Sequence, residues 1–168
     1  HATNVWITLN PDGSAQVSDD GRGIPTDVHP VHKKSALELV MTQLHAGGKF
    51  GGDAYKISGG LHGVGASVVN ALSDWVWVEV RRGKDIYRQR YERGLVKSPV
   101  EIVKDSLVEL EDVKKLKQGT TTTFFPDNSI FPSIEFDFDF IKKIVRERAY
   151  LVPKLYFHIL DKRKEPVK

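Results

Sequence analysis

The 168-residue chain contains no cysteine, which excludes a disulfide scaffold and any thiolate metal site. It contains no apolar run near the roughly 20 residues that a membrane helix needs, and no charged and apolar leader opens it. No tract has a disordered composition, and no internal repeat occurs. These absences predict one soluble domain over residues 1–168, located in the cytoplasm and without a membrane partner.

Motifs of several known chemistries are missing as well. The P-loop pattern G-x-x-x-x-G-K-[ST] occurs nowhere. The histidines lack the H-E-x-x-H spacing of a zinc site, so no metal site built from histidine is predicted. The net charge of +3 is scattered apart from a basic tail at 162–164. A solvated surface is therefore favoured over a nucleic-acid footprint.

The first feature that is present is a predicted β-hairpin. Apolar residues alternate along 5–9 and along 15–17, with a Pro-Asp-Gly turn at 11–13 between them.

Helical spacing predicts helices at 35–44, at 63–72 with Val64, Val68 and Leu72 in one stripe, and at 140–148. Gly47-Gly48 is expected to end the first helix. Further strands are expected at 75–80, 86–91, 120–125 and 155–160, and no element is assigned to 98–119. The predicted fold is α+β, a two-layer sandwich with a mixed, largely antiparallel sheet.

Asp19 has the same parity as Ala15 and Val17, so its carboxylate should point to their apolar face if the strand continues. A buried carboxylate needs donors, and the exocyclic amine of adenine is one. Guanine presents a carbonyl there, so ATP would be preferred over GTP by a few kcal/mol. In the alternative interpretation, the strand ends at Val17, and Asp19 and Asp20 cap a turn.

Gly21 and Gly23 flank Arg22 and precede Ile24-Pro25, a pattern that predicts a chain reversal with positive φ. Without a Cβ, Gly23 would admit a purine, and the two apolar residues would form a wall beside it. An ordinary surface turn is the alternative.

The segment Gly63-Val64-Gly65 opens the second predicted helix, where free N–H groups and the helix dipole favour an anion such as a triphosphate. Close packing also produces glycine-rich helix starts, and the spacing resembles a degraded dinucleotide fingerprint. Residues 56–60 are not a convincing buried strand, which counts against the dinucleotide.

The run at 44–52 places four glycines around Lys49. Such a run is costly to order, so it predicts a lid that closes on a ligand. Lys49 would neutralise a terminal phosphate or remain a solvated surface lysine, and His62 would donate to phosphate or pack.

In this order and spacing, Asp19-x-Gly21-x-Gly23, Gly47-Gly48-Lys49, residues 60–65 and Gly119-Thr120 resemble the motifs of the GHKL ATPases. This is the family of gyrase, the heat-shock chaperone, the histidine kinases and MutL, and it implies the Bergerat ATP-binding fold. Segments 44–50 and 58–65 are similar, almost letter for letter, to the B subunits of bacterial DNA gyrase and topoisomerase IV. The likeness is strong up to about Gly94 and weaker but collinear afterwards.

The resemblance implies roles for individual residues. Asp19 would bind the adenine amine directly and through a water that Thr120 supports. The base would be lined by Gly23, Ile24 and Pro25. The phosphates would be held by Gly47, Gly48, Lys49, Tyr55, Leu61, His62, Gly63, Val64 and Gly65. The pocket mouth, where family members bind aminocoumarin inhibitors, would carry Arg22 and Arg88.

One departure from the family concerns hydrolysis. The family's glutamate that activates the attacking water and its asparagine that holds Mg²⁺ lie on a helix just before the position of His1. The N-terminal arm that swaps between subunits would also lie upstream, and a transducer domain would lie beyond Lys168. We therefore expect an N-terminally truncated ATPase domain without a catalytic residue or metal ligand of its own, and negligible hydrolysis.

For the parent protein, the resemblance implies ATP and Mg²⁺ as cofactors, DNA as substrate, and dimerisation of B subunits on ATP binding. A gyrase A-type subunit would carry the DNA-cleaving tyrosine. Gyrase is expected over topoisomerase IV. The runner-up is a nucleotide-binding regulatory module without hydrolysis, and the third interpretation is a dinucleotide-dependent oxidoreductase.

Overall fold

The structure, a computed structural model, describes residues 2–28, 30, 33–44 and 64–163. The strands in these ranges are β1 (Asn4–Leu9), β2 (Ala15–Asp19), β3 (Ser73–Arg82), β4 (Asp85–Glu92), β5 (Leu95–Val96), β6 (Glu101–Val103), β7 (Gln118–Pro126) and β8 (Tyr156–Asp161). The helices are α1 (Ala36–Thr42), α2 (Gly65–Ala71), α3 (Glu111–Lys114) and α4 (Phe138–Leu151).

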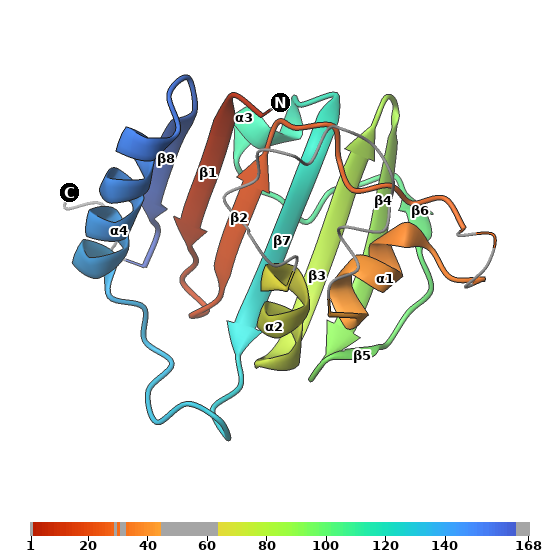
Figure 1. Cartoon of the computed structure of the whole chain (residues 1–168), viewed down its shortest axis with the longest axis horizontal. Helices are drawn as coiled ribbons and strands as arrows, with labels where there is room; N and C mark the ends of the chain where they lie inside the picture. Colours follow the sequence, from red (N-terminus) through yellow and green to blue (C-terminus); the bar gives the residue numbers. More distant parts are fainter. Residues whose placement is uncertain (1, 29, 31–32, 45–63, 164–168) are drawn as a thin grey trace.

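All described strands join one sheet (Figure 1). Its order is β5-β4-β3-β7-β2-β1-β8, and β6 pairs with β4 outside this path. The described pairs are antiparallel except that of β1 with β8, which is parallel. The predicted mixed, largely antiparallel α+β fold is therefore confirmed, and so is the hairpin of β1 and β2.

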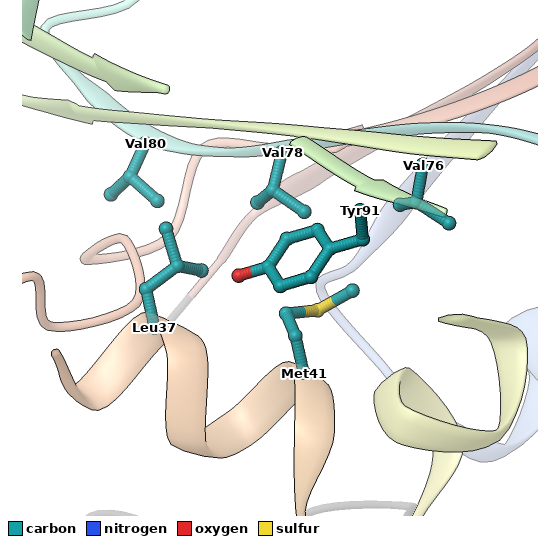
Figure 2. Packing of buried hydrophobic residues seen from close by; sticks show 6 residues of the cluster. All are labelled: Leu37, Met41, Val76, Val78, Val80 and Tyr91. Carbon is teal, nitrogen blue, oxygen red and sulfur yellow. The ribbon is translucent and has the colours of Figure 1, made fainter. Parts of the chain in front are cut away.

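Helices α1 and α2 lie over one face of the sheet, which we call the helical face (Figure 1). Figure 2 shows side chains of α1 pointing to the valines of β3, with a tyrosine ring of β4 beside them. This core is at most 1% exposed and consists of Leu37, Met41, Val76, Val78, Val80 and Tyr91. Each such burial contributes about 1.5–3 kcal/mol relative to exposure, so the core fixes α1 on β3 and β4.

Helix α1 begins where the sequence predicts but ends earlier. The Ser35 side chain caps it by accepting a hydrogen bond of 3.0 Å from Glu38 N. The helix ends at Thr42, because Gln43 is already extended, so the expected stop at Gly47-Gly48 is wrong. The Thr42 hydroxyl donates to the Glu38 carbonyl at 2.7 Å and closes the last turn locally.

The apolar stripe expected on α2 is not its buried face. Val68 and Leu72 are 41% and 36% exposed, whereas Ser67 and Asn70 are 6% and 0% exposed. The polar residues point inward because they hydrogen-bond there: Ser67 Oγ donates to the Val64 carbonyl at 3.0 Å, and Asn70 bonds neighbouring segments. The spacing rule identified a helix but selected the wrong side of it.

Asn70 is expected to contribute strongly to stability. Its Nδ2 donates to the carbonyls of Met41 at 2.9 Å and Gly94 at 3.3 Å, which joins α1, α2 and the turn after β4. Asn70→Ala leaves these carbonyls unpaired, and we expect a loss of about 1–3 kcal/mol in the free energy of unfolding. Urea denaturation measures it against the exposed control Val68→Ala, which should change stability by roughly 0.5 kcal/mol or less. Equal losses in the two variants would contradict the role of Asn70.

The opposite face of the sheet is covered by α3 and the loops beside it. Trp6 of β1 packs there with Val108 and Val113, which are 1% and 0% exposed. The sequence assigned no structure to α3, β5 or β6. These elements are too short to display a periodic pattern, and β6 exists because it pairs with β4.

Candidate functional site

Asp19 is the last residue of β2, and its neighbours in the sheet fix its direction. It pairs with Val5 of β1 and with Thr120 of β7. Its side chain therefore shares the helical face with Ala15 and Val17, as predicted. The alternative in which the strand ends at Val17 does not hold.

The helical face is solvent-accessible at Val17 of β2, contrary to the expectation of an apolar core there, although Ala15 on the same face is 4% exposed. Val17 is 38% exposed, whereas Gln16 and Ser18 on the opposite face are 8% and 1% exposed. The cause is tertiary, because the core of the helical face is built by α1 on β3 and β4 and not on β2. A half-buried Asp19 thus stands at the border between core and solvent.

The Asp19 carboxylate is partly desolvated. Burial raises its pKa above the ordinary value, and backbone hydrogen bonds from Gly21 and Thr120 oppose the rise. The Gly21 N–H donates to Asp19 Oδ1 at 2.8 Å. Asp19 therefore also caps the turn that follows, as the alternative interpretation proposed, while its side chain faces the helical layer.

Two glycines let the segment after Asp19 pack directly on the sheet. Gly23 has φ of +74°, and a Cβ there would lie 2.8 Å from Val80 Cγ1. Gly119 has φ of +140°, and a Cβ there would collide with the Asp19 carbonyl oxygen. The predicted positive φ at Gly23 is confirmed, but the contact that requires glycine is the core valine.

The residues predicted to surround a base are brought together in part. The Ile24 N–H donates to Thr120 Oγ1 at 3.2 Å, which ties the loop to the residue paired with Asp19. Ile24 packs against the core of the helical face, and Pro25 is half-buried. Arg22 is exposed.

Helix α2 begins at Gly65 with Val64 at the N-cap, and no side chain caps it. A Cβ at Gly65 would meet no atom within 4 Å, so close packing in the described structure does not explain this glycine. The remaining predicted phosphate-binding residues lie outside the described residues, and their roles stay predictions: Gly47, Gly48, Lys49, Tyr55, Leu61, His62 and Gly63.

Comparison with known proteins decides the family. A family model described as "Histidine kinase-, DNA gyrase B-, and HSP90-like ATPase" matches residues 1–130. The chain belongs to this ATPase family. The B subunit of DNA gyrase from Thermotoga maritima is 53% identical over 158 residues, which cover 94% of this chain and 23% of that protein. The B subunit of the type 2 topoisomerase from Aquifex aeolicus is 48% identical over 163 residues, or 97% of this chain and 19% of that protein.

A solved ATPase-family structure is also similar. It is the 43K ATPase domain of Thermus thermophilus gyrase B in complex with an aminocoumarin. The TM-score is 0.79 at 38% identity, with 99% of this chain and 39% of that chain covered. The chain spans about a fifth of the length of its curated relatives.

Arg88, predicted at the pocket mouth of this ATPase domain, lies on the face opposite to Asp19. Arg88 of β4 pairs with Glu79 of β3. The residue after Glu79, Val80, pairs with Thr120 and points to the helical face, so Glu79 and Arg88 point to the opposite face. Arg88 Nη2 donates to Glu79 Oε1 at 2.6 Å and to the Asp105 carbonyl at 2.6 Å. The structure does not bring Arg88 to Asp19, and its role toward aminocoumarins stays a prediction.

Sequence reasoning missed the buried ionic network around Glu79. Its carboxylate accepts hydrogen bonds from Arg88, from the Ser106 hydroxyl at 2.5 Å and from Leu107 N at 2.8 Å. Arg81, 3% exposed, donates to Ser106 Oγ at 2.6 Å. Glu79 and Arg81 alternate with the valines of β3, which indicates that both charged side chains share one face of the sheet. Their partners lie in a loop that no local pattern identifies.

Other types of site find little support. Among the described residues, no cluster of three or more His, Asp or Glu side chains is arranged to hold a metal ion, so no step is assigned to Mg²⁺ here. No helix in the described ranges is long and apolar enough to cross a membrane. A cavity of about 360 Å³ lies on the face opposite to Asp19, between Gln16, Trp77 and Glu109, and none of its lining residues belongs to the predicted site.

Proposed function

We propose that this chain binds ATP on the helical face, with the adenine amine donating to the Asp19 carboxylate. The observation that carries the proposal is the position of Asp19, at the end of β2 and at the border between core and solvent. Its raised pKa indicates a carboxylate that lacks full solvation. A bound N–H donor would replace the hydrogen bonds from water that the carboxylate loses on burial.

The same geometry supports a preference for adenine. The 6-amino group of adenine donates to the carboxylate, whereas the carbonyl of guanine would face it as a second acceptor. An unpaired polar group in a desolvated site costs roughly 1–3 kcal/mol, so discrimination of ten- to a hundredfold is expected. Thr120, Gly23, Ile24 and Pro25 would surround the base.

The phosphates would extend toward the start of α2. Among the described residues, no side chain caps the first N–H groups of this helix, and none would meet a Cβ added at Gly65. Lys49 and Tyr55 would add donors from the glycine-rich segment. These roles rest on the family resemblance.

The parent protein in this proposal is a gyrase B-type subunit of a type IIA topoisomerase in the cytoplasm. The gyrase relatives named above support gyrase over topoisomerase IV. Residues 1–168 would form the ATP-binding core, and the general-base glutamate and the Mg²⁺-binding asparagine would come from outside them. The parent would dimerise on binding ATP, work with a gyrase A-type subunit and pass DNA strands. The chain by itself would hydrolyse ATP negligibly.

Calorimetric titration of the chain with non-hydrolysable ATP and GTP analogues tests the proposal. We expect saturable binding of the ATP analogue and binding of the GTP analogue that is weaker by ten- to a hundredfold. Equal affinity for the two analogues would refute the adenine site. Binding of neither by a folded chain would refute ATP binding by residues 1–168 alone.

A further inference from the structure

The second acid of the Asp19-Asp20 pair has a different environment from the first. Asp20 Oδ1 accepts hydrogen bonds from the backbone N–H groups of Thr3 at 2.7 Å and Asn4 at 2.9 Å. Asp20 Oδ2 accepts from Thr3 Oγ1 at 2.6 Å and Asn4 Nδ2 at 2.9 Å. Desolvation by itself would raise the pKa of Asp20, but these four donors together outweigh it and lower the pKa to about 2.

These bonds fix the start of β1 beside the nucleotide site. Asn4 also bonds His158 of β8 at 2.9 Å, and the Thr3 carbonyl accepts from Tyr156 N at 2.8 Å. The residues that enter β1 are therefore held from both neighbouring strands. A carboxylate with its donors already in place is not available to a ligand, so Asp20 has a task other than that of Asp19.

The fixed segment lies beside the turn that orients Asp19. A Cβ built on Gly21 would lie 3.7 Å from Ala2 Cβ and 2.6 Å from Asp19 Oδ1. Gly21 is buried, and its N–H is the donor to that same oxygen. A side chain at position 21 would therefore meet both Ala2 and the Asp19 carboxylate, so Ala2 lies beside the turn, and Thr3 and Asn4 hold the segment that carries it.

We propose that Asp20 is a positioning residue of the nucleotide site, which fixes residues 2–4 against Gly21 and thereby sets the Asp19 carboxylate for adenine. This inference rests on the proposed function. It assigns separate tasks to two adjacent acids: Asp19 contacts the base, and Asp20 holds the support of Asp19. Because both oxygens of Asp20 accept hydrogen bonds from two consecutive residues, Thr3 and Asn4, they fix the direction of this segment as well as its distance from Asp20.

Two variants test the clamp from its two sides. Asp20→Asn keeps the shape but turns an NH₂ group toward two of the donors, so at least one of the four bonds is lost and the charge that strengthens the others is removed. Thr3→Val removes the hydroxyl, which donates to Asp20 and accepts from Asn4 Nδ2, and keeps the charge of Asp20. Asp127→Asn is the matched control, because Asp127 is also a carboxylate held by Ser129 and Arg93, but it follows β7 at the end away from Thr120.

Two measurements follow, both well below the unfolding temperature. The first is the affinity for the ATP and GTP analogues. Asp20→Asn should bind the ATP analogue about tenfold more weakly and lose most of the preference for it over the GTP analogue. Thr3→Val should bind the ATP analogue about threefold more weakly. Hydrogen exchange in the free chain should show faster exchange of the Gly21 N–H in both variants. Asp127→Asn should alter neither quantity.

Faster unfolding or a lower Tm without these changes would mean a purely structural clamp and would overturn the proposal. A change of affinity in Asp20→Asn with none in Thr3→Val would mean that the charge acts directly, which also overturns it. If the unaltered chain does not distinguish the two analogues, the proposed function has failed. In that case hydrogen exchange of the Gly21 N–H by itself tests whether Asp20 positions the turn. Unchanged protection of this N–H in both variants refutes the positioning role.

Discussion

The Asp19→Asn chain is expected to lose its preference for the ATP analogue and to weaken ATP binding by about a hundredfold. The amide cannot present two acceptors to the adenine amine, and its own NH₂ would face that donor. In the absence of nucleotide, the same variant should be as stable as the unaltered chain or more stable at pH 7. An Asn oxygen still accepts from the Gly21 N–H, and no charge remains to be desolvated.

The sign of the pH dependence follows from the raised pKa of Asp19. Because protonation is easier in the folded chain, Asp19 contributes stability below its unfolded pKa, and this contribution is lost as pH rises through the folded pKa. The stability gained by Asp19→Asn should therefore be largest near pH 7 and vanish in acid. ATP affinity of the unaltered chain should fall as pH drops through the raised pKa.

Urea denaturation from pH 3 to pH 8 and calorimetry at pH 7 measure the two effects. A large loss of stability in Asp19→Asn at pH 7 would identify Asp19 as a structural residue that caps its turn. Undiminished ATP preference in the variant would remove Asp19 from the base site. Gain of stability with loss of binding is the combination that only a ligand-binding acid predicts.

The second large effect concerns the network on the opposite face. Glu79→Ala should reduce the free energy of unfolding by about 3–5 kcal/mol, because it removes the only acid among the described residues that contacts buried Arg81. The side chain of Glu79 is 3% exposed. Its loss also frees Ser106 and Leu107, which hold the covering loop to β3.

Chemical denaturation with a double-mutant cycle measures this contribution. The cycle compares Glu79→Ala, Arg88→Ala and the double variant. We expect a favourable coupling energy of more than about 1 kcal/mol between the two side chains, since the pair is largely buried. Glu79→Gln, which keeps the volume, should cost less than Glu79→Ala. ATP affinity should remain within about twofold, because these residues lie on the other face. A cost below roughly 1 kcal/mol for Glu79→Ala would contradict the buried network.

Much of the fold follows from short-range pattern. Alternation in residues 5–9 and 15–17 predicted the hairpin, and the parity of Asp19 predicted the face to which it points. Both succeed because side chains in a strand alternate strictly, whatever the sheet later packs against. Helical spacing likewise located α1, α2 and α4, although it chose the wrong buried side for α2.

Local sequence pattern does not predict burial or hydrogen-bond partners that depend on segments distant in the sequence. That Val17 is exposed and Ser18 buried depends on where α1 and the loops around α3 settle, and neither is encoded near β2. The four donors around Asp20 come from residues 16 and 17 positions away. Strand parity places Asp20 on the other face from Asp19, but nothing local indicates which donors it meets there.

The sequence alone therefore determined the family, the order of the main elements and the identity of the acid that faces the helical layer, because motif spacing and strand parity are local properties of the chain. Only the tertiary structure separated the tasks of Asp19 and Asp20, turned Arg88 to the opposite face and buried Glu79. Each of these depends on which groups from remote segments supply the hydrogen bonds that a desolvated charge requires.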